Sequence, residues 1–180
     1  PPRVLCLLTH GFEEIETVTP VDLLRRAGAE VVLAGLTPER LLRGRCGIAI
    51  ETDTSLPDEP DVAGFDLLLL PGGPGVKALR TDGRPARLAR AMHAAGKPTA
   101  AICAAPTILA DAGLLLGRRF TAHGSVHAEL PAVLADQRVV VDGLLITSRG
   151  AGTALDFGLA LVQHLFGEAK AREISQAIMA

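Results

Sequence analysis

Short apolar runs alternate with segments of helical periodicity, and this alternation limits the chain to a fold with a parallel sheet. Arg3–Leu8 and Glu30–Leu36 have the length and apolar content of buried strands. Between them, Glu13–Ala27 has acidic residues in its first turn, arginines in its last turn and Gly28 as a stop signal, which predicts a helix. A strand, a helix and a strand of this length form a βαβ unit.

The same alternation continues to the end of the chain, which predicts a single α/β domain over residues 1–180, with a mostly parallel sheet and helices on both faces. Asp142-Gly143 between two apolar runs is a strong hairpin signal. The further predicted elements are strands at Phe65–Leu70 and Thr99–Ile102, a hairpin over Arg138–Thr147, and helices at Arg84–Ala95, Gly150–Leu165 and Glu168–Ile178.

Other segments give weaker signals. Residues 40–52 predict an edge strand or part of a hairpin, and Asp53–Gly64 reads as a loop. Phe120–His123 predicts a short strand, and Ser125–Ala135 a loop with a broken helix. Pro20 lies inside the first predicted helix, where its missing N–H leaves the carbonyl of Glu16 without its helical partner, so we expect a kink or a bifurcated first turn there.

The composition excludes several classes of function. A hydrophobic content of 48% excludes disorder, and a net charge of −2 offers no basic surface for nucleic acid or an anionic membrane. Five Phe with no Trp or Tyr exclude a platform for base stacking. Three scattered cysteines argue against a disulfide scaffold. With no basic leader and no apolar run of membrane length, we expect a cytoplasmic protein.

Cys103 lies in a tight turn between the predicted strand Thr99–Ile102 and a helix that Pro106 opens. The amides at a helix N-terminus favour negative charge, and a cysteine there can have its thiol pKa lowered from about 8.5. The alternative interpretation is a small buried hydrophobic residue.

The catalytic interpretation of Cys103 gains support from its neighbours in the predicted fold. Sites in open parallel sheets form at the carboxyl ends of the strands, where loops bearing a thiol, carboxylates, imidazoles and a glycine turn would share one rim. These loops are His10–Glu16, Pro71–Gly75, Cys103–Pro106 and His123–His127.

Glu16 is the predicted partner of Cys103. A carboxyl beside a thiolate in a partly apolar cleft has a raised pKa, because two negative charges do not share such a site. Protonated, Glu16 would donate a hydrogen bond to the sulfur or act as a general acid and base for a bound carbonyl. Glu13 and Glu14 are interpreted as ordinary charges at a helix N-terminus.

Gly72 and Gly73 would let backbone N–H groups approach a ligand as an oxyanion hole requires, or they simply form a tight turn. The run fits neither a P-loop nor a dinucleotide fingerprint. His123 and His127 are four residues apart but lack a third metal ligand, so we expect no metal and interpret His123 as a base or polar neighbour of the thiol. No Gly-x-Ser-x-Gly elbow is present, which disfavours a serine hydrolase.

Six motifs, in order along nearly the whole chain, resemble the ThiJ/PfpI superfamily (class I glutamine amidotransferase-like), in the branch of the Parkinsonism-associated protein deglycase and its bacterial relatives. They are Gly11–Thr17, Pro20–Asp22, Arg25–Gly28, Leu70–Gly73, Ala100–Pro106 and Thr147–Thr153.

The resemblance implies a flavodoxin-like three-layer sandwich, a homodimer and no cofactor. It implies a reactive Cys103 at a nucleophile elbow beside a protonated Glu16, with His123 nearby. The residues that it implies at the substrate pocket are Gly72, Gly73, Ala104, Arg26 and Arg45, the two arginines at a dimer interface.

The implied activity is protection against stress by a glyoxalase III or a protein or nucleotide deglycase. Its substrates would be small α-oxoaldehydes such as methylglyoxal, or glycated proteins. One alternative is a redox sensor or chaperone in which Cys103 is oxidised to a sulfinate. Another is an amidase or peptidase, but the peptidase branch has a histidine where this chain has Ala104. Gly124 likewise replaces the proline expected after the histidine.

Overall fold

A seven-stranded, mostly parallel sheet forms the centre of the computed structural model, which describes residues 1–180. The strand order is β5-β2-β1-β6-β7-β9-β8, and only β8 runs antiparallel to its neighbour. The strands are β1 (Arg3–Leu8), β2 (Glu30–Gly35), β5 (Thr54–Ser55), β6 (Leu67–Leu70), β7 (Thr99–Ile102), β8 (Val139–Asp142) and β9 (Leu145–Ser148). Taken without the edge strands, β2-β1-β6-β7-β9 has the flavodoxin-like order 2-1-3-4-5, which confirms the predicted fold class.

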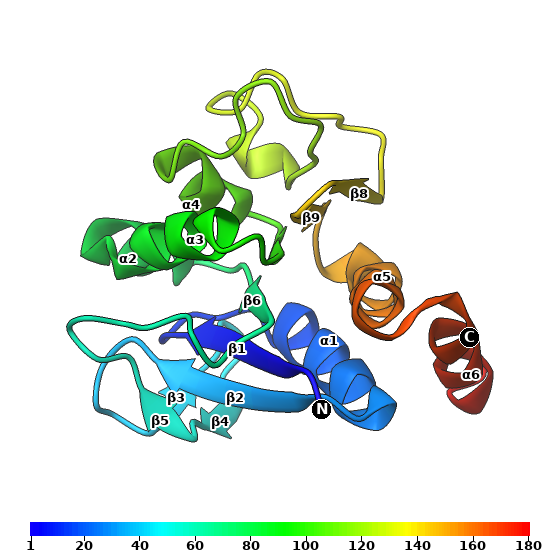
Figure 1. The fold of residues 1–180 in the computed structure, drawn as a ribbon. Coiled ribbons are helices and arrows are strands. Elements are labelled where there is room, and N and C mark those ends of the chain that lie inside the picture. The colour runs from blue at the N-terminus through cyan, green and yellow to red at the C-terminus, as the bar shows by residue number, and fades with distance from the viewer.

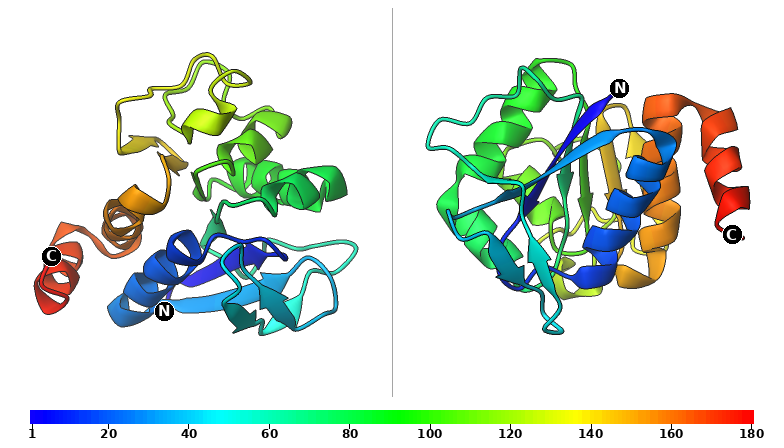
Figure 2. Two further views of the ribbon diagram at one scale, coloured as in Figure 1. Left: turned by 180° about the vertical axis from the view of Figure 1, so that it is seen from behind. Right: turned by 90° about the horizontal axis from the view of Figure 1, so that it is seen from below.

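Helices cover both faces of the sheet (Figures 1 and 2). One layer consists of α1 (Glu14–Ala27), α5 (Ala154–Phe166) and α6 (Glu168–Ala177), with α6 packed outside α5. The other layer consists of α2 (Val76–Asp82), α3 (Arg84–Ala94) and α4 (Pro106–Asp111). None of these helices is long and apolar enough to cross a membrane.

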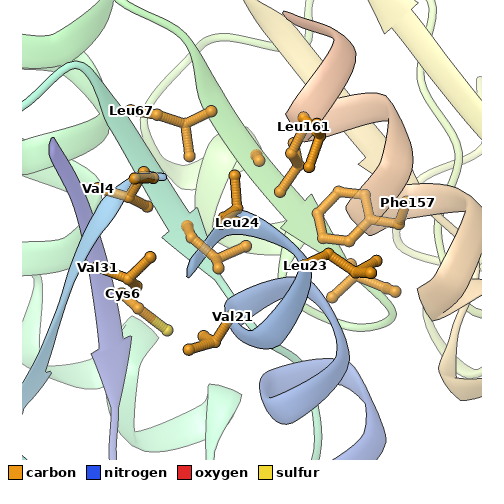
Figure 3. Packing of buried hydrophobic residues seen from close by; sticks show 14 of the residues in the cluster. Val4, Cys6, Val21, Leu23, Leu24, Val31, Leu67, Phe157 and Leu161 are labelled. Carbon is orange, nitrogen blue, oxygen red and sulfur yellow. The ribbon is translucent and has the colours of Figure 1, made fainter. Parts of the chain in front are cut away.

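The central strands are apolar on both faces because each face packs against helices. In β6, Leu67 and Leu69 belong to the core under α1 and α5, whereas Leu68 and Leu70 belong to the core under α2–α4. Successive side chains of a strand point to opposite faces, so a continuous leucine run supplies both cores. Figure 3 shows the first core, where Leu23 and Leu24 of α1 face Phe157 and Leu161 of α5.

The helix α1 runs through Pro20 without interruption, so the predicted kink does not break it. Its N-cap Glu13 accepts a hydrogen bond from the Glu16 N–H at 2.7 Å, and Gly28 ends it with φ 103°. The helix α5 crosses α1 closely here, because a Cβ at Gly158 would lie 3.1 Å from Pro20 Cα. Packing against α5 therefore stabilises the helical turn before Pro20, which lacks one backbone hydrogen bond.

The irregular segments are where the sequence predictions were incomplete. Residues 40–52 form the hairpin β3 (Leu41–Arg43) and β4 (Ala49–Glu51), a separate two-stranded sheet. The helix α2 and the short strand β5 were not predicted.

Two predictions between α4 and β8 were wrong in whole or in part. Phe120–His123 does not form a strand, since the Thr121 N–H donates to the Thr147 hydroxyl rather than to a backbone partner. Ser125–Ala135 is the predicted loop, but in place of the broken helix it contains only the end of a 3₁₀ turn, η1 (Gly124–Val126).

Candidate active site

The strand order places a crevice beside Cys103. The chain leaves β1 toward β2 on one side and leaves β6 toward β7 on the other, so β1 and β6 form a topological switch point. Loops after such a pair of strands diverge and leave room for a ligand at their carboxyl ends. Cys103 follows β7, the neighbour of β6, and therefore lies at the same edge of the sheet.

Cys103 occupies a strained turn, as an elbow requires. Its φ is 67°, a left-handed conformation that costs a residue other than glycine on the order of 1–3 kcal/mol. Backbone hydrogen bonds hold it there on both sides: its N–H donates to the Ser148 carbonyl at 3.0 Å, and its carbonyl accepts from the His123 N–H at 2.9 Å. The predicted placement between a strand and the helix opened by Pro106 is confirmed.

Glu16 lies in the first turn of α1, fully buried, and meets Cys103 across Gly72. A Cβ atom built on Gly72 would lie 2.6 Å from Cys103 Cβ and 2.8 Å from Glu16 Oε1. Neither oxygen of Glu16 accepts a hydrogen bond from a nitrogen or oxygen donor, so the thiol is the polar group that the carboxyl faces. The predicted pairing of Glu16 with Cys103 agrees with this geometry.

Burial raises the pKa of Glu16 from its ordinary value of 4.5 to about 7, although contact with the thiol opposes the shift. This value includes two smaller effects, since the negative charge of Glu13 raises the pKa and the positive charge of Arg45 lowers it. The direction predicted for Glu16 is therefore confirmed. A carboxyl with a pKa near neutrality can both give and take a proton at physiological pH.

The prediction that the turn lowers the pKa of the Cys103 thiol is wrong. Burial, and after it the negative charge and contact of Glu16, raise this pKa to about 12, although the backbone N–H groups of Gly73 and Ala104 oppose the shift. The helix that follows has only six residues, so its dipole is weak beside these effects.

The thiol and the carboxyl titrate as one coupled pair. When Glu16 is ionised, its charge keeps the proton on the sulfur. When Glu16 is protonated, that charge is gone and the carboxyl becomes a donor to the sulfur. The thiolate therefore forms as the proton passes to Glu16.

Two backbone N–H groups act on the thiol. Those of Gly73 and Ala104 lower the pKa of Cys103, and neither has a backbone hydrogen-bond partner. Gly73 has φ 98°, and a Cβ there would lie 2.5 Å from the Gly11 carbonyl oxygen, so only glycine fits. Two converging N–H groups are what an oxyanion formed on the sulfur-bound carbon needs.

The loops predicted to share a rim do contact one another. The Glu13 N–H donates to the Gly72 carbonyl at 3.0 Å, and the Gly75 N–H donates to the Gly11 carbonyl at 3.0 Å. The same edge opens into a cleft of about 650 Å³, lined by Gly73 and Ala104 together with side chains of α2 and α4.

Glu14 has a role that the sequence analysis missed. Its Oε1 accepts hydrogen bonds from the N–H groups of Cys46 at 2.7 Å and Ile48 at 3.4 Å, which fastens the β3–β4 loop to α1. A Cβ at Gly44 would lie 2.3 Å from this carboxyl oxygen. Glu14 is thus a buried anchor rather than an ordinary helix charge, while Glu13 acts as the N-cap.

Of the remaining predicted site residues, Arg45 and His123 lie near the site and Arg26 does not. Arg45 lies in the anchored loop, donates its N–H to the Phe12 carbonyl at 2.9 Å and acts on the charge of Glu16. His123 is exposed beside the elbow, with Nδ1 accepting from the Ser125 N–H at 3.1 Å. Arg26 pairs with Asp22 in the last turn of α1, roughly 15 Å along the helix from Glu16. A role for Arg26 in the pocket stays a prediction that needs a second copy of the chain.

No three His, Cys, Asp or Glu side chains converge to hold a metal ion. His127 uses Nε2 to contact the Ala122 carbonyl at 3.0 Å and does not join His123 in a ligand pair. The chemistry that the arrangement offers is therefore that of a thiol, a neutral-range carboxyl and two backbone donors.

Replacing Gly72 with alanine tests the contact between the thiol and the carboxyl. The new Cβ would also lie 2.8 Å from the Ile102 carbonyl oxygen, which cannot rotate away. We expect the free energy of unfolding to fall by about 1–3 kcal/mol, and the pH profile of Cys103 alkylation to change. Gly124→Ala is the control, because its Cβ would meet nothing within 4 Å. Equal stability in denaturant titrations of both variants would contradict the close contact.

The chain is similar to known proteins over most of its length. A family model described as DJ-1/PfpI family matches residues 2–164. Protein dj-1beta of Drosophila melanogaster is 37% identical over 179 residues, which cover 97% of this chain and 95% of the relative. A protein of Bacillus subtilis named putative cysteine protease YraA is 36% identical over 150 residues, 82% of this chain and 88% of that protein. The structure titled Toxoplasma gondii DJ-1, oxidized, superposes with a TM-score of 0.89 and 30% identity, covering 99% and 98% of the two chains.

Proposed function

The chain belongs to the DJ-1/PfpI family, and on that premise we propose that it is a cysteine-dependent, cofactor-free enzyme of stress protection. Its substrates would be methylglyoxal-type α-oxoaldehydes or the adducts that they form on proteins. The observation that carries this proposal is the buried Glu16, with a pKa raised to about 7, facing Cys103 across Gly72.

The geometry supports a sequence of steps without an external oxidant. As the proton passes to Glu16, the Cys103 thiolate adds to the aldehyde carbon of methylglyoxal, and the N–H groups of Gly73 and Ala104 stabilise the oxyanion. Glu16 gives its proton to that oxygen, which forms a hemithioacetal and leaves Glu16 ionised.

The ionised Glu16 then takes the hydrogen of the former aldehyde carbon as a proton and returns a proton to the neighbouring carbon, while the hydroxyl proton of the hemithioacetal passes to the former ketone oxygen. The product is a lactoyl thioester on Cys103. Water cleaves the thioester, releasing lactate and restoring the thiol. The aldehyde carbon is oxidised and the neighbouring carbon is reduced within one molecule. One methylglyoxal and one water therefore give one lactic acid, and no external oxidant or reductant is needed.

We also propose that the protein is cytoplasmic and forms a homodimer. The dimer is supported by apolar side chains that are exposed beside the site. Ile15 and Val18 of α1 are 53% and 50% exposed, and Ile48 of the β3–β4 loop is 58% exposed. A surface of this kind on a helix and the adjoining loop is typical of an interface between subunits. Sedimentation equilibrium measures the mass directly.

Redox sensing is the second candidate, favoured by the partial exposure of the Cys103 thiol next to a carboxyl that can donate a hydrogen bond. Two molecules of hydrogen peroxide would convert the thiolate to a sulfinate and two of water. A relative's structure is titled as oxidized. An amidase or peptidase is less well supported, because Ala104 occupies the position after the nucleophile and the His123 ring nitrogen Nδ1 contacts Ser125.

Incubation of the purified protein with methylglyoxal in the absence of glutathione tests the proposal. We expect stoichiometric conversion to lactate, with solvent deuterium at carbon 2 when the reaction runs in heavy water, because Glu16 exchanges its proton before returning it. Intact-mass measurement after peroxide treatment runs in parallel. If no lactate forms and peroxide gives a stable two-oxygen adduct on Cys103, the proposed enzyme activity is rejected and redox sensing is supported.

A further inference from the structure

A second cleft lies on the other side of the His123 loop, and the proposed reaction does not use it. Its volume is about 520 Å³, and we call it the basic cleft. Its floor adjoins the elbow, since Cys103 bonds through its backbone to His123 and to Ser148, the residue before Arg149. The residues lining the basic cleft are Ala122–Gly124, His127, Ala135, Arg138 and Arg149–Thr153.

The basic cleft carries positive charge without acidic lining. No Asp or Glu belongs to its lining. Arg149 is exposed and has neither an ion pair nor a side-chain hydrogen bond, so its guanidinium is free for a ligand. Arg138 also lines the basic cleft, and its Nε donates to Asp156 at 2.6 Å and its Nη2 to the Gly152 carbonyl at 3.1 Å. These bonds fix the direction of the Arg138 guanidinium and neutralise part of its charge.

One histidine adds a further donor. Because His123 Nδ1 accepts from the Ser125 N–H, the proton of its neutral ring is assigned to Nε2, which has no partner. His127 Nε2 lies 3.0 Å from the Ala122 carbonyl and is therefore assigned as protonated, so the neutral His127 ring has only an acceptor, Nδ1, left over. The backbone N–H groups of Ala151 and Gly152 also lack hydrogen-bond partners.

We propose that the basic cleft binds the phosphate group of a small organic phosphate. A phosphate presents several acceptor oxygens, which match the planar donor fork of Arg149, the second guanidinium and the His123 Nε2–H together. A carboxylate has only two oxygens and would leave several of these donors unused. The lining also includes the apolar side chains of Ala122 and Ala135, and a cleft of about 520 Å³ has room for an organic group beside the phosphate.

Isothermal titration calorimetry with inorganic phosphate, glycerol 3-phosphate and glycerol tests the proposal on the full chain. We expect saturable one-to-one binding of both phosphates and none of glycerol. Tighter binding of glycerol 3-phosphate than of inorganic phosphate supports the organic ligand. Equal affinity would overturn the organic part, since the phosphate group alone would then be recognised.

Arg149→Gln should weaken binding of glycerol 3-phosphate by about 10-fold or more, since a charge-assisted hydrogen bond is lost. Arg149→Lys, which keeps the charge, should recover part of that affinity. Arg90→Gln on the exposed face of α3 is the matched control and should bind as the parent chain does. Wild-type affinity in a folded Arg149→Gln variant overturns the proposal. The same titration of the Cys103→Ala variant should give the affinity of the parent chain, because the basic cleft does not use the thiol. This result separates phosphate binding from the proposed reaction.

Discussion

Substituting Cys103 with alanine should abolish the formation of lactate from methylglyoxal, a loss of at least about 10³-fold. The thiol is the one group at the site that can form a covalent bond to the aldehyde carbon. Glu16 and the N–H groups of Gly73 and Ala104 act on that adduct and have nothing to stabilise without it. Lactate measured enzymatically after a fixed time, with and without protein, gives the result.

The variant should fold as the parent chain does. Alanine at φ 67° carries the same kind of backbone strain as cysteine, and the hydrogen bonds to Ser148 and His123 use only backbone atoms. Cys46→Ser is the matched control, since this exposed thiol in the β3–β4 loop leaves the elbow untouched. Sustained lactate production by a folded Cys103→Ala protein would exclude covalent catalysis at this residue.

Much of the fold could be predicted because its signals are local. Both faces of β6 are buried, so its run of leucines is enough to predict a buried strand. Gly28 likewise marks the end of α1, because glycine readily adopts the left-handed conformation found there. The strand order then follows from the rules for parallel sheets, and it brings Cys103 and Glu16 to one edge. The helix α2 gave no comparable signal, since its seven residues follow a glycine-rich loop directly.

The features that could not be predicted depend on residues far apart in the sequence. Glu14 resembles Glu13 in the sequence, yet its partner amides at Cys46 and Ile48 lie 32 and 34 residues away. The pKa of Cys103 rises because the folded chain buries the thiol against Glu16, whereas sequence reasoning considered only the helix that follows. Local sequence patterns therefore predicted that Cys103 and Glu16 meet. The pKa values of the two groups depend on how deeply the fold buries them, which local patterns do not give.

Glu16→Gln should remove a pH dependence of stability that the parent chain shows. In the folded protein the pKa of Glu16 is raised from 4.5 to about 7, so the folded state keeps a proton that the unfolded chain releases. The stabilisation from holding this proton is complete below pH 4.5, is lost as the pH rises through 7, and stays lost above that. Glutamine, which is neutral at every pH, has the shape of the protonated carboxyl and no such loss.

The size of the effect follows from the shift. Because the carboxyl is fully buried, a shift from 4.5 to about 7 corresponds to roughly 3 kcal/mol in the free energy of unfolding. Urea titrations at several values between pH 4.5 and 7.5 should show the parent chain losing about this much relative to Glu16→Gln. Glu59→Gln, which removes an exposed carboxyl outside the site, should follow the parent chain throughout. A difference between parent and Glu16→Gln that stays constant with pH would mean that Glu16 is ionised beside the sulfur, and the proton that the proposed reaction moves would have no donor.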